Sequence, residues 1–200
     1  MNNIRPIEKG ERWLLGGSAG SGKSYLGRTL ANIFVPYSNV IYFDSKNEGS
    51  GKVETLQNLQ KKIPQLSKTA GKIIRVLFDG MDKGDDELSS DLFTSILRNG
   101  NIVLWFDEAY CIPDTAPLRR IFTQGRTKNI SVISCSQRPV GIPRVMISES
   151  TRFCIFNMCD KRDRDTVGAF VQGGVTTKGR FRFDYYDIID DQRLNDLKIK

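Results

Sequence analysis

Histidine is absent from this chain of 200 residues, and its absence removes the base on which the usual serine and cysteine triads depend. Only four cysteines are present, none of them in a CxxC pair: Cys111, Cys135, Cys154 and Cys159. We therefore expect no zinc site, and we expect Cys135 and Cys154, which lie in apolar runs, to be small buried residues. Any acid–base chemistry falls to carboxylates, lysines or bound water.

Long apolar runs are also missing. No stretch of about 18 apolar residues occurs, so we expect no transmembrane segment. Residues 1–11 are polar and carry charges of both signs, unlike a secretory signal peptide. The sequence therefore favours a cytosolic protein.

The composition suits one compact domain over residues 1–200, because 39% of the residues are hydrophobic. Residues 1–11 form an N-terminal arm in this interpretation, and Gly173-Gly174 marks a loop before a small C-terminal appendage, which takes up about 171–200. The net charge of +7 favours a polyanionic partner such as nucleic acid, although many basic proteins are merely soluble.

Apolar runs and helical periodicities alternate along the chain, which predicts an α/β fold with a mostly parallel sheet flanked by helices. The expected strands are 12–16, 39–44, 72–78, 101–107, 129–137 and 152–157, and 180–186 is an edge strand or hairpin. The expected helices are 22–34, 53–63 with Pro64 at its end, 87–98, 117–124 and 160–170.

A phosphate-binding loop follows the first strand, since the segment 17–24 matches GxxxxGK[ST] in full. Its amide groups can cradle phosphates at a helix N-terminus, Lys23 can bridge the β- and γ-phosphates of ATP, and Ser24 can ligate Mg²⁺. A glycine-rich turn without a ligand is the alternative, and the strand before and helix after disfavour it. The nucleotide-binding residues are Gly17, Ser18, Ala19, Gly20, Ser21, Gly22, Lys23 and Ser24.

Two acids end the apolar strand 101–107. Asp107 is expected to bind nucleotide-bound Mg²⁺ together with Ser24, and Glu108 to polarise the attacking water. A solvated loop is the alternative for this pair, and the loop at 17–24 makes it less attractive. The glutamate also disfavours a kinase for a small molecule.

Gln137 closes the next strand in the segment Ser134-Cys-Ser-Gln-Arg-Pro139. Its amide could contact the γ-phosphate or the lytic water. A polar strand end followed by a turn explains the same residues, and both interpretations stay open.

The ordered set of motifs resembles the FtsK–HerA superfamily of DNA-pumping ATPases, with a RecA-like P-loop NTPase fold of the ASCE type. Within it, the chain is most similar to the small genome-packaging ATPases of viruses with internal membranes and double jelly-roll capsids. The resemblance spans residues 12–170. The matching motifs are Asp44-Ser-Lys-Asn-Glu48, Asp107-Glu-Ala109, Gln124-Gly-Arg126, Ser-Gln-Arg-Pro139 and Asp160-Lys-Arg-Asp163. The first resembles an Asp-Pro-Lys-Gly-Glu-like pattern of the superfamily, from which Ser45 and Asn47 depart.

The resemblance implies an ATP hydrolase that uses Mg²⁺, forms a ring of five or six identical subunits and translocates double-stranded DNA. It makes Arg126 an arginine finger, with Arg119 and Arg120 as competitors and a solvated surface arginine as the alternative. A capsid vertex or membrane component would hold such a motor, in the host cytoplasm or at the virion vertex.

Basic runs at Lys161-Arg162, Arg164 and Lys178 to Arg182 are candidate DNA contacts or a solvated face. The function predicted from the sequence is a viral DNA-packaging motor. The alternatives are a conjugation or phage-assembly ATPase of the same superfamily, which commonly has a membrane anchor, and a nucleotide-gated assembly scaffold that hydrolyses ATP slowly.

Overall fold

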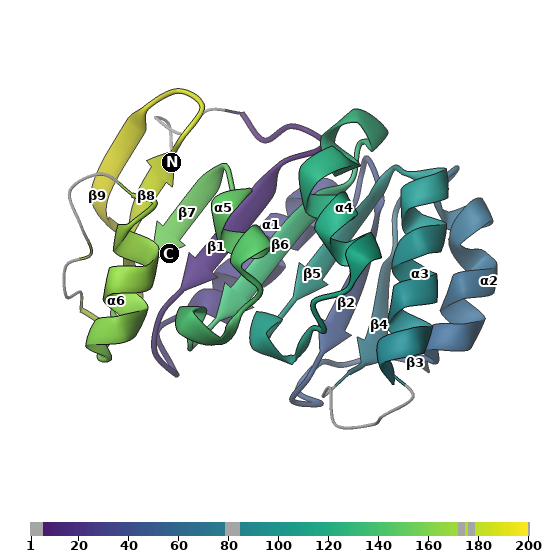
Figure 1. The fold of residues 1–200 in the computed structure, drawn as a ribbon, viewed down its shortest axis with the longest axis horizontal. Helices are drawn as coiled ribbons and strands as arrows, with labels where there is room; N and C mark the ends of the chain where they lie inside the picture. Colours follow the sequence, from purple (N-terminus) through teal and green to yellow (C-terminus); the bar gives the residue numbers. More distant parts are fainter. Residues whose placement is uncertain (1–5, 79–84, 172–174, 176–178, 200) are drawn as a thin grey trace.

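The structure is a computed structural model and describes residues 6–78, 85–171, 175 and 179–199. A nine-stranded sheet with the order β3-β4-β2-β5-β6-β1-β7-β8-β9 forms its centre (Figure 1). The strands are β1 (Arg12–Gly16), β2 (Asn39–Asp44), β3 (Val53–Glu54), β4 (Ile73–Leu77), β5 (Ile102–Phe106), β6 (Ser131–Ser136), β7 (Arg152–Ile155), β8 (Arg182–Asp187) and β9 (Gln192–Lys198). All pairings from β3 to β7 are parallel, which confirms the predicted α/β class.

Helices cover both faces of this sheet. They are α1 (Lys23–Phe34), α2 (Leu56–Leu66), α3 (Asp85–Asn99), α4 (Ala116–Gln124), α5 (Arg144–Ser148) and α6 (Lys161–Gly168), with 3₁₀ turns η1 (Ala109–Cys111), η2 (Gly125–Lys128) and η3 (Pro139–Gly141). Figure 1 shows α3 and α4 in front of the sheet and α1 behind it.

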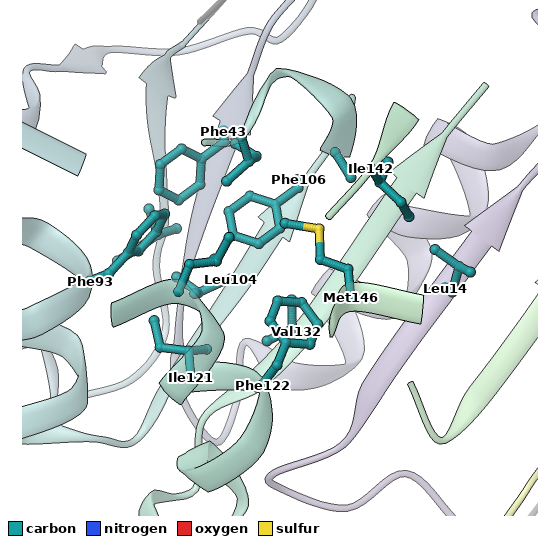
Figure 2. Close-up of a cluster of buried hydrophobic side chains, with 14 of the residues drawn as sticks. Leu14, Phe43, Phe93, Leu104, Phe106, Ile121, Phe122, Val132, Ile142 and Met146 are labelled. Carbon is teal, nitrogen blue, oxygen red and sulfur yellow. The ribbon is translucent and has the colours of Figure 1, made fainter. Parts of the chain in front are cut away.

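The strands are continuously apolar because successive side chains enter two different cores. Leu104 and Phe106 of β5 pack on the side of α2 to α6, whereas Val103 and Trp105 pack on the side of α1. Figure 2 shows the first of these cores, in which the rings of Phe43 and Phe106 lie 5.0 Å apart between their centroids. Because both faces of the strands are packed, the strand ends that carry the polar residues are held in fixed positions.

The C-terminal hairpin extends the same sheet. β8 pairs antiparallel with β7, and β9 forms the outer edge. The segment 180–186 therefore belongs to a hairpin. Gly173-Gly174 and Lys178 lie outside the described residues.

Both predicted ends of the second helix are wrong. Its first two predicted residues, Val53 and Glu54, form the short strand β3 beside β4, and α2 begins at Leu56. Pro64 does not end the helix, because it lies inside α2, which continues to Leu66. The proline removes one helical hydrogen bond, the one that an amide at position 64 would donate to the carbonyl of residue 60. Burial of Ile63 and Leu66, together with a hydrogen bond from the Asn39 side chain to the Leu66 carbonyl, holds the last turn in place.

Cys135 and Cys154 are buried, as expected from their apolar surroundings, and burial raises the pKa of both thiols. Among the helices of the described residues, none has the length and apolar character needed to cross a membrane.

Candidate nucleotide-binding and catalytic site

The carboxyl ends of β1, β5 and β6 meet at one edge of the sheet. Gly16 is in register with Ser136, and Phe106 is in register with Ser134. The residues after these strands therefore start side by side, at the edge where open α/β sheets bind ligands. This topology brings the segment 17–24, Asp107-Glu108 and Gln137 together.

The glycines of the loop have identifiable steric roles. Gly20 and Gly22 have φ angles of 68° and 110°, in the left-handed region that favours glycine. A Cβ atom on Gly17 would lie 2.5 Å from the Cβ of Phe156, so no side chain fits there. The Ser18 amide donates to the Asn157 carbonyl at 2.7 Å, and the Gly17 amide donates to the Ser136 carbonyl at 3.1 Å. The loop is thus anchored to both neighbouring strands.

Lys23 is only 4% exposed although it carries an ammonium group. Its Nζ donates to the Ser18 carbonyl across the loop at 2.8 Å. Burial lowers the pKa of Lys23, and the nearby Glu108 and Asp107 carboxylates only partly oppose this effect. A buried ammonium at a helix N-terminus gives the loop the charge needed to bind an anion.

Ser24 and Asp107 touch one another through a side-chain hydrogen bond. Burial raises the pKa of Asp107, and the Ser24 hydroxyl opposes the rise. The Asp107 carboxylate is 1% exposed, and its Oδ1 atom has no hydrogen-bond partner in the described structure. One hydroxyl and one carboxylate with an unused oxygen fit Mg²⁺, which usually takes its other ligands from phosphate and water.

Glu108 is 2% exposed and is held through one of its two oxygens. Gln137 Nε2 donates to Glu108 Oε1 at 2.6 Å, and Lys46 Nζ forms an ion pair with the same oxygen. The other oxygen, Oε2, is buried and has no hydrogen-bond partner in the described structure. The contact between Gln137 and Glu108 is compatible with either role expected for Gln137, and the role stays a prediction.

Lys46 is the site residue that the sequence did not single out as functional. It follows β2, which is adjacent to β5, so its loop lies next to the loop of Glu108. The only signal was its place in the motif 44–48, and the strand order is needed to connect that motif with Glu108.

Asp44 organises the loop that presents Lys46. Its carboxylate accepts the amides of Lys46, Glu48 and Gly49 and also pairs with Arg75, whose Nε lies 2.7 Å from Asp44 Oδ2. Asn47 has a φ angle of 56°. The superfamily pattern has glycine at the place of Asn47, and asparagine is among the residues that tolerate this left-handed conformation.

Arg126 lies far from the other predicted site residues of its own chain. It belongs to η2, immediately before β6, and so lies at the amino ends of the parallel strands. The six residues of β6, about 20 Å of strand, separate it from the edge with the phosphate loop. Arg126 is exposed there.

The two competing arginines are also exposed, on α4. Arg119 makes a two-pronged contact with Asp114, with its Nε 2.8 Å from Oδ1 and its Nη2 2.7 Å from Oδ2. Arg120 Nε donates to Gln124 Oε1 at 3.4 Å.

Some of the basic side chains predicted to touch DNA already bond to other groups of the chain, whereas others are exposed. Arg164 Nη1 donates to the carbonyls of Met158 and Cys159, and Arg182 is paired with Asp196. Lys161 and Arg162 are exposed at the start of α6.

Known proteins with a similar sequence or fold include nucleotide-dependent packaging enzymes. No protein-family model matches the chain. It is 40% identical over 116 residues to the DNA packaging ATPase P9 of Enterobacteria phage PRD1, a match that covers 52% of this chain and 51% of that protein. The match thus spans about half the length of this curated relative.

Solved structures are similar over nearly the whole chain. The genome packaging NTPase B204 from Sulfolobus turreted icosahedral virus 2, in complex with AMP, has a TM-score of 0.73 at 18% identity and covers 98% of this chain and 100% of B204. VirB4 of Thermoanaerobacter pseudethanolicus has a TM-score of 0.65 at 12% identity, covering 94% of this chain and 89% of VirB4. The resemblance inferred from the motifs is therefore confirmed: the chain is similar to viral genome-packaging ATPases, in sequence over half its length and in fold over nearly all of it.

Proposed function

We propose that this chain is the ATPase of a viral genome-packaging motor, which couples hydrolysis of Mg²⁺-bound ATP to movement of double-stranded DNA into a capsid. The observation that carries the proposal is the placement of Glu108. It is buried beside the phosphate loop, with one oxygen bound by Lys46 and Gln137 and the other oxygen available as an acceptor. A carboxylate held in this way suits the orientation of a water molecule.

The loop residues would bind the triphosphate. The amides of Gly20 to Ser24 and the Lys23 ammonium neutralise phosphate charge, which is the main requirement of phosphoryl transfer. Ser24 and Asp107 would hold Mg²⁺. The metal supplies positive charge to the β- and γ-phosphate oxygens when it is bound.

Glu108 would accept a hydrogen bond from the lytic water at Oε2. Gln137 would then have two tasks: its Nε2 donates to the Glu108 carboxylate, and from the end of β6 the same side chain would contact the γ-phosphate or the lytic water. With these assignments, Glu108 is required for hydrolysis of the nucleotide but not for its binding.

A homo-oligomeric ring of five or six subunits is part of the proposal. Arg126 is exposed at the sheet edge opposite its own phosphate loop, so it is suited to reach the nucleotide of a neighbouring subunit. Such a ring would act in the host cytoplasm or at the virion vertex, attached to a capsid vertex or to a membrane component.

The decisive experiment measures ATP hydrolysis with and without duplex DNA, using Glu108→Gln protein as the inactive control. A motor should hydrolyse ATP faster when DNA is added. A nucleotide-gated scaffold should show slow turnover that DNA does not change, and that result would overturn the proposal.

A further inference from the structure

The proposed site fixes the direction in which a nucleotide lies along the sheet edge. Glu108 and Gln137 follow β5 and β6, so the γ-phosphate belongs on that side of the phosphate loop. The sheet order continues from β1 to β7 and β8 on the other side. The ribose and base of a bound nucleotide must therefore leave the loop toward β7 and β8. This step, and the inference built on it, rests on the proposed function.

Phe181 lies on that side, directly against the loop. It precedes β8, and because β8 is antiparallel to β7, the start of β8 is at the nucleotide edge. The Phe181 amide donates to the Ser21 carbonyl at 3.2 Å. A Cβ atom on Gly22 would lie 2.9 Å from Phe181 Cδ1 and equally close to Ile199 Cδ1. The ring thus packs against the backbone of the phosphate loop.

Exposure and backbone conformation set this aromatic ring apart from its neighbour two residues later. Phe181 is 39% exposed, whereas Phe183 is 5% exposed and belongs to the core on the α1 side. The φ angle of Phe181 is 59°, in the left-handed region that a bulky residue rarely adopts. The guanidinium of Arg180 lies over the ring, 4.8 Å from the centroid, so the ring face accepts a planar group.

A purely structural role does not account for these features. The hairpin is already attached to the loop by the Phe181 amide, and the Phe181 carbonyl accepts the Ile199 amide at 3.0 Å. Those contacts use backbone atoms that every residue except proline has. An exposed aromatic ring beside a phosphate site is the arrangement that suits stacking on a base.

We propose that Phe181 is the stacking platform for the base of the bound nucleotide, and that the base takes the place over the ring where the Arg180 guanidinium lies. Stacking uses the π-face that every base has, so the platform adds affinity without choosing between adenine and guanine. The phosphate loop binds the triphosphate independently of this contact.

The test compares a nucleotide with a ligand that has no base. We would measure dissociation constants for the non-hydrolysable nucleotide AMPPCP, its guanine counterpart GMPPCP and inorganic tripolyphosphate. Phe181→Ala should weaken both nucleotides by roughly tenfold or more and leave tripolyphosphate unchanged. Phe181→Leu keeps an apolar side chain against Gly22 and should show the same selective loss, which separates stacking from a loosened hairpin.

Phe181→Trp should retain nucleotide affinity, and its indole emission should be quenched by AMPPCP but not by tripolyphosphate. The two native tryptophans, Trp13 and Trp105, are 3% and 2% exposed and give a constant background. Tyr37→Ala is the matched control, because Tyr37 is 64% exposed but lies beyond the far end of α1.

If Phe181→Leu weakens binding of all three ligands equally, or leaves the affinity for both nucleotides unchanged, Phe181 is not a stacking platform. Either result would leave the proposed ATPase function unaffected. Wild-type protein that binds neither AMPPCP nor tripolyphosphate would instead overturn the nucleotide site, and the platform with it.

Discussion

Lys46 Nζ forms an ion pair with Glu108 Oε1, and this contact joins the loops that follow the neighbouring strands β2 and β5. Burial acts to lower the pKa of Lys46, but the hydrogen bond and charge of Glu108 outweigh it, so the pKa is raised. The ammonium therefore stays charged at neutral pH. It holds one oxygen of the carboxylate and leaves Oε2 to the reaction.

The first prediction concerns Glu108 itself. Glu108→Gln should bind ATP about as well as wild type and lose about a hundredfold or more in turnover, because an amide cannot accept the proton of the lytic water. Nucleotide binding by fluorescence titration and steady-state hydrolysis would be measured on the same preparation. Lys23→Ala is the comparison, since loss of the phosphate-loop ammonium should weaken both quantities. Hydrolysis by Glu108→Gln at the wild-type rate would refute the assignment of the catalytic acid.

The second prediction separates the positioning role of Lys46 from nucleotide binding. Lys46→Ala should lower kcat by about tenfold while changing nucleotide affinity little, because Glu108 loses the cation that fixes its orientation. Lys46→Arg should recover part of the rate, since its guanidinium can still pair with the carboxylate. Lys52→Ala removes a charge from the same connection between β2 and β3 and serves as the control. A Lys46→Ala protein with unchanged kcat would show that the ion pair does not position Glu108.

The third prediction concerns the stability of the loop that carries Lys46. Arg75→Met leaves the buried Asp44 carboxylate without its cation and should reduce the free energy of unfolding at pH 7 by about 3 kcal/mol. Urea denaturation would measure this loss. Arg182→Met, which breaks a pair exposed at 39% and 51%, should shift the midpoint little.

The pH dependence of this loss has a definite sign. Burial tends to raise the pKa of Asp44, but hydrogen bonds from Gly49, Arg75 and Glu48 hold it below its ordinary value. Because the folded-state pKa is depressed, the contribution is complete above the unfolded-state pKa of about 3.9 and is lost as the pH falls below that value. The stability gap between wild type and Arg75→Met should therefore shrink in acid. A gap that widens there would contradict the assignment.

Local patterns were sufficient for much of the fold. β1 and β2 have the predicted bounds, because each is an apolar run with a polar residue at its start and a glycine or an aspartate at its end. β9 escaped prediction, since it lies at the sheet edge and only Leu194 and Leu197 pack against the core. The helix α5 has five residues, too few for a helical periodicity to be read.

The candidate site could be predicted only as far as single motifs reach. The phosphate-loop pattern and the acid at the end of β5 predict that Ser24 and Asp107 act together, and the structure brings them into contact. The Lys46 contact depends on β2 lying beside β5, a neighbour relationship that no local pattern contains. The position of Phe181 against Gly22 likewise depends on the antiparallel pairing of β8 with β7, which no pattern near the phosphate loop contains.

The fourth prediction concerns DNA. A protein with a net charge of +7 should bind duplex DNA through phosphates, so its affinity should fall steeply with salt and depend little on base sequence. Of the basic side chains predicted to touch DNA, Lys161 and Arg162 are exposed on α6. Replacing both by alanine should weaken binding and reduce the slope of log K against log salt by about 2.

The matched control removes the same charge elsewhere. Lys61→Ala with Lys62→Ala changes two exposed residues of α2 and should lower affinity only slightly. If this control reduces the slope as much as the α6 variant, binding reflects overall charge. An absence of DNA binding at low salt, at concentrations that allow assembly, would count against the motor itself.

The last prediction tests whether Arg126 acts on a neighbouring subunit. Its place at the amino ends of the strands, a whole strand length away from its own phosphate loop, rules out direct contact with its own nucleotide in this conformation. Arg126→Ala should therefore bind ATP normally yet hydrolyse it on the order of 10³-fold more slowly, because charge on the transferred phosphoryl group is no longer neutralised.

Mixing two inactive proteins makes the test specific. Glu108→Gln protein has an inactive site but an intact Arg126, whereas Arg126→Ala protein has an intact site but lacks the finger. Mixed rings should regain activity wherever the site of an Arg126→Ala subunit meets the finger of a Glu108→Gln subunit. Arg119→Ala and Arg120→Ala, mixed in the same way, are the controls, and Arg119 is already engaged by Asp114. No recovery in rings verified to be mixed would refute action between subunits, and recovery that needs Arg119 or Arg120 would transfer the role to that residue.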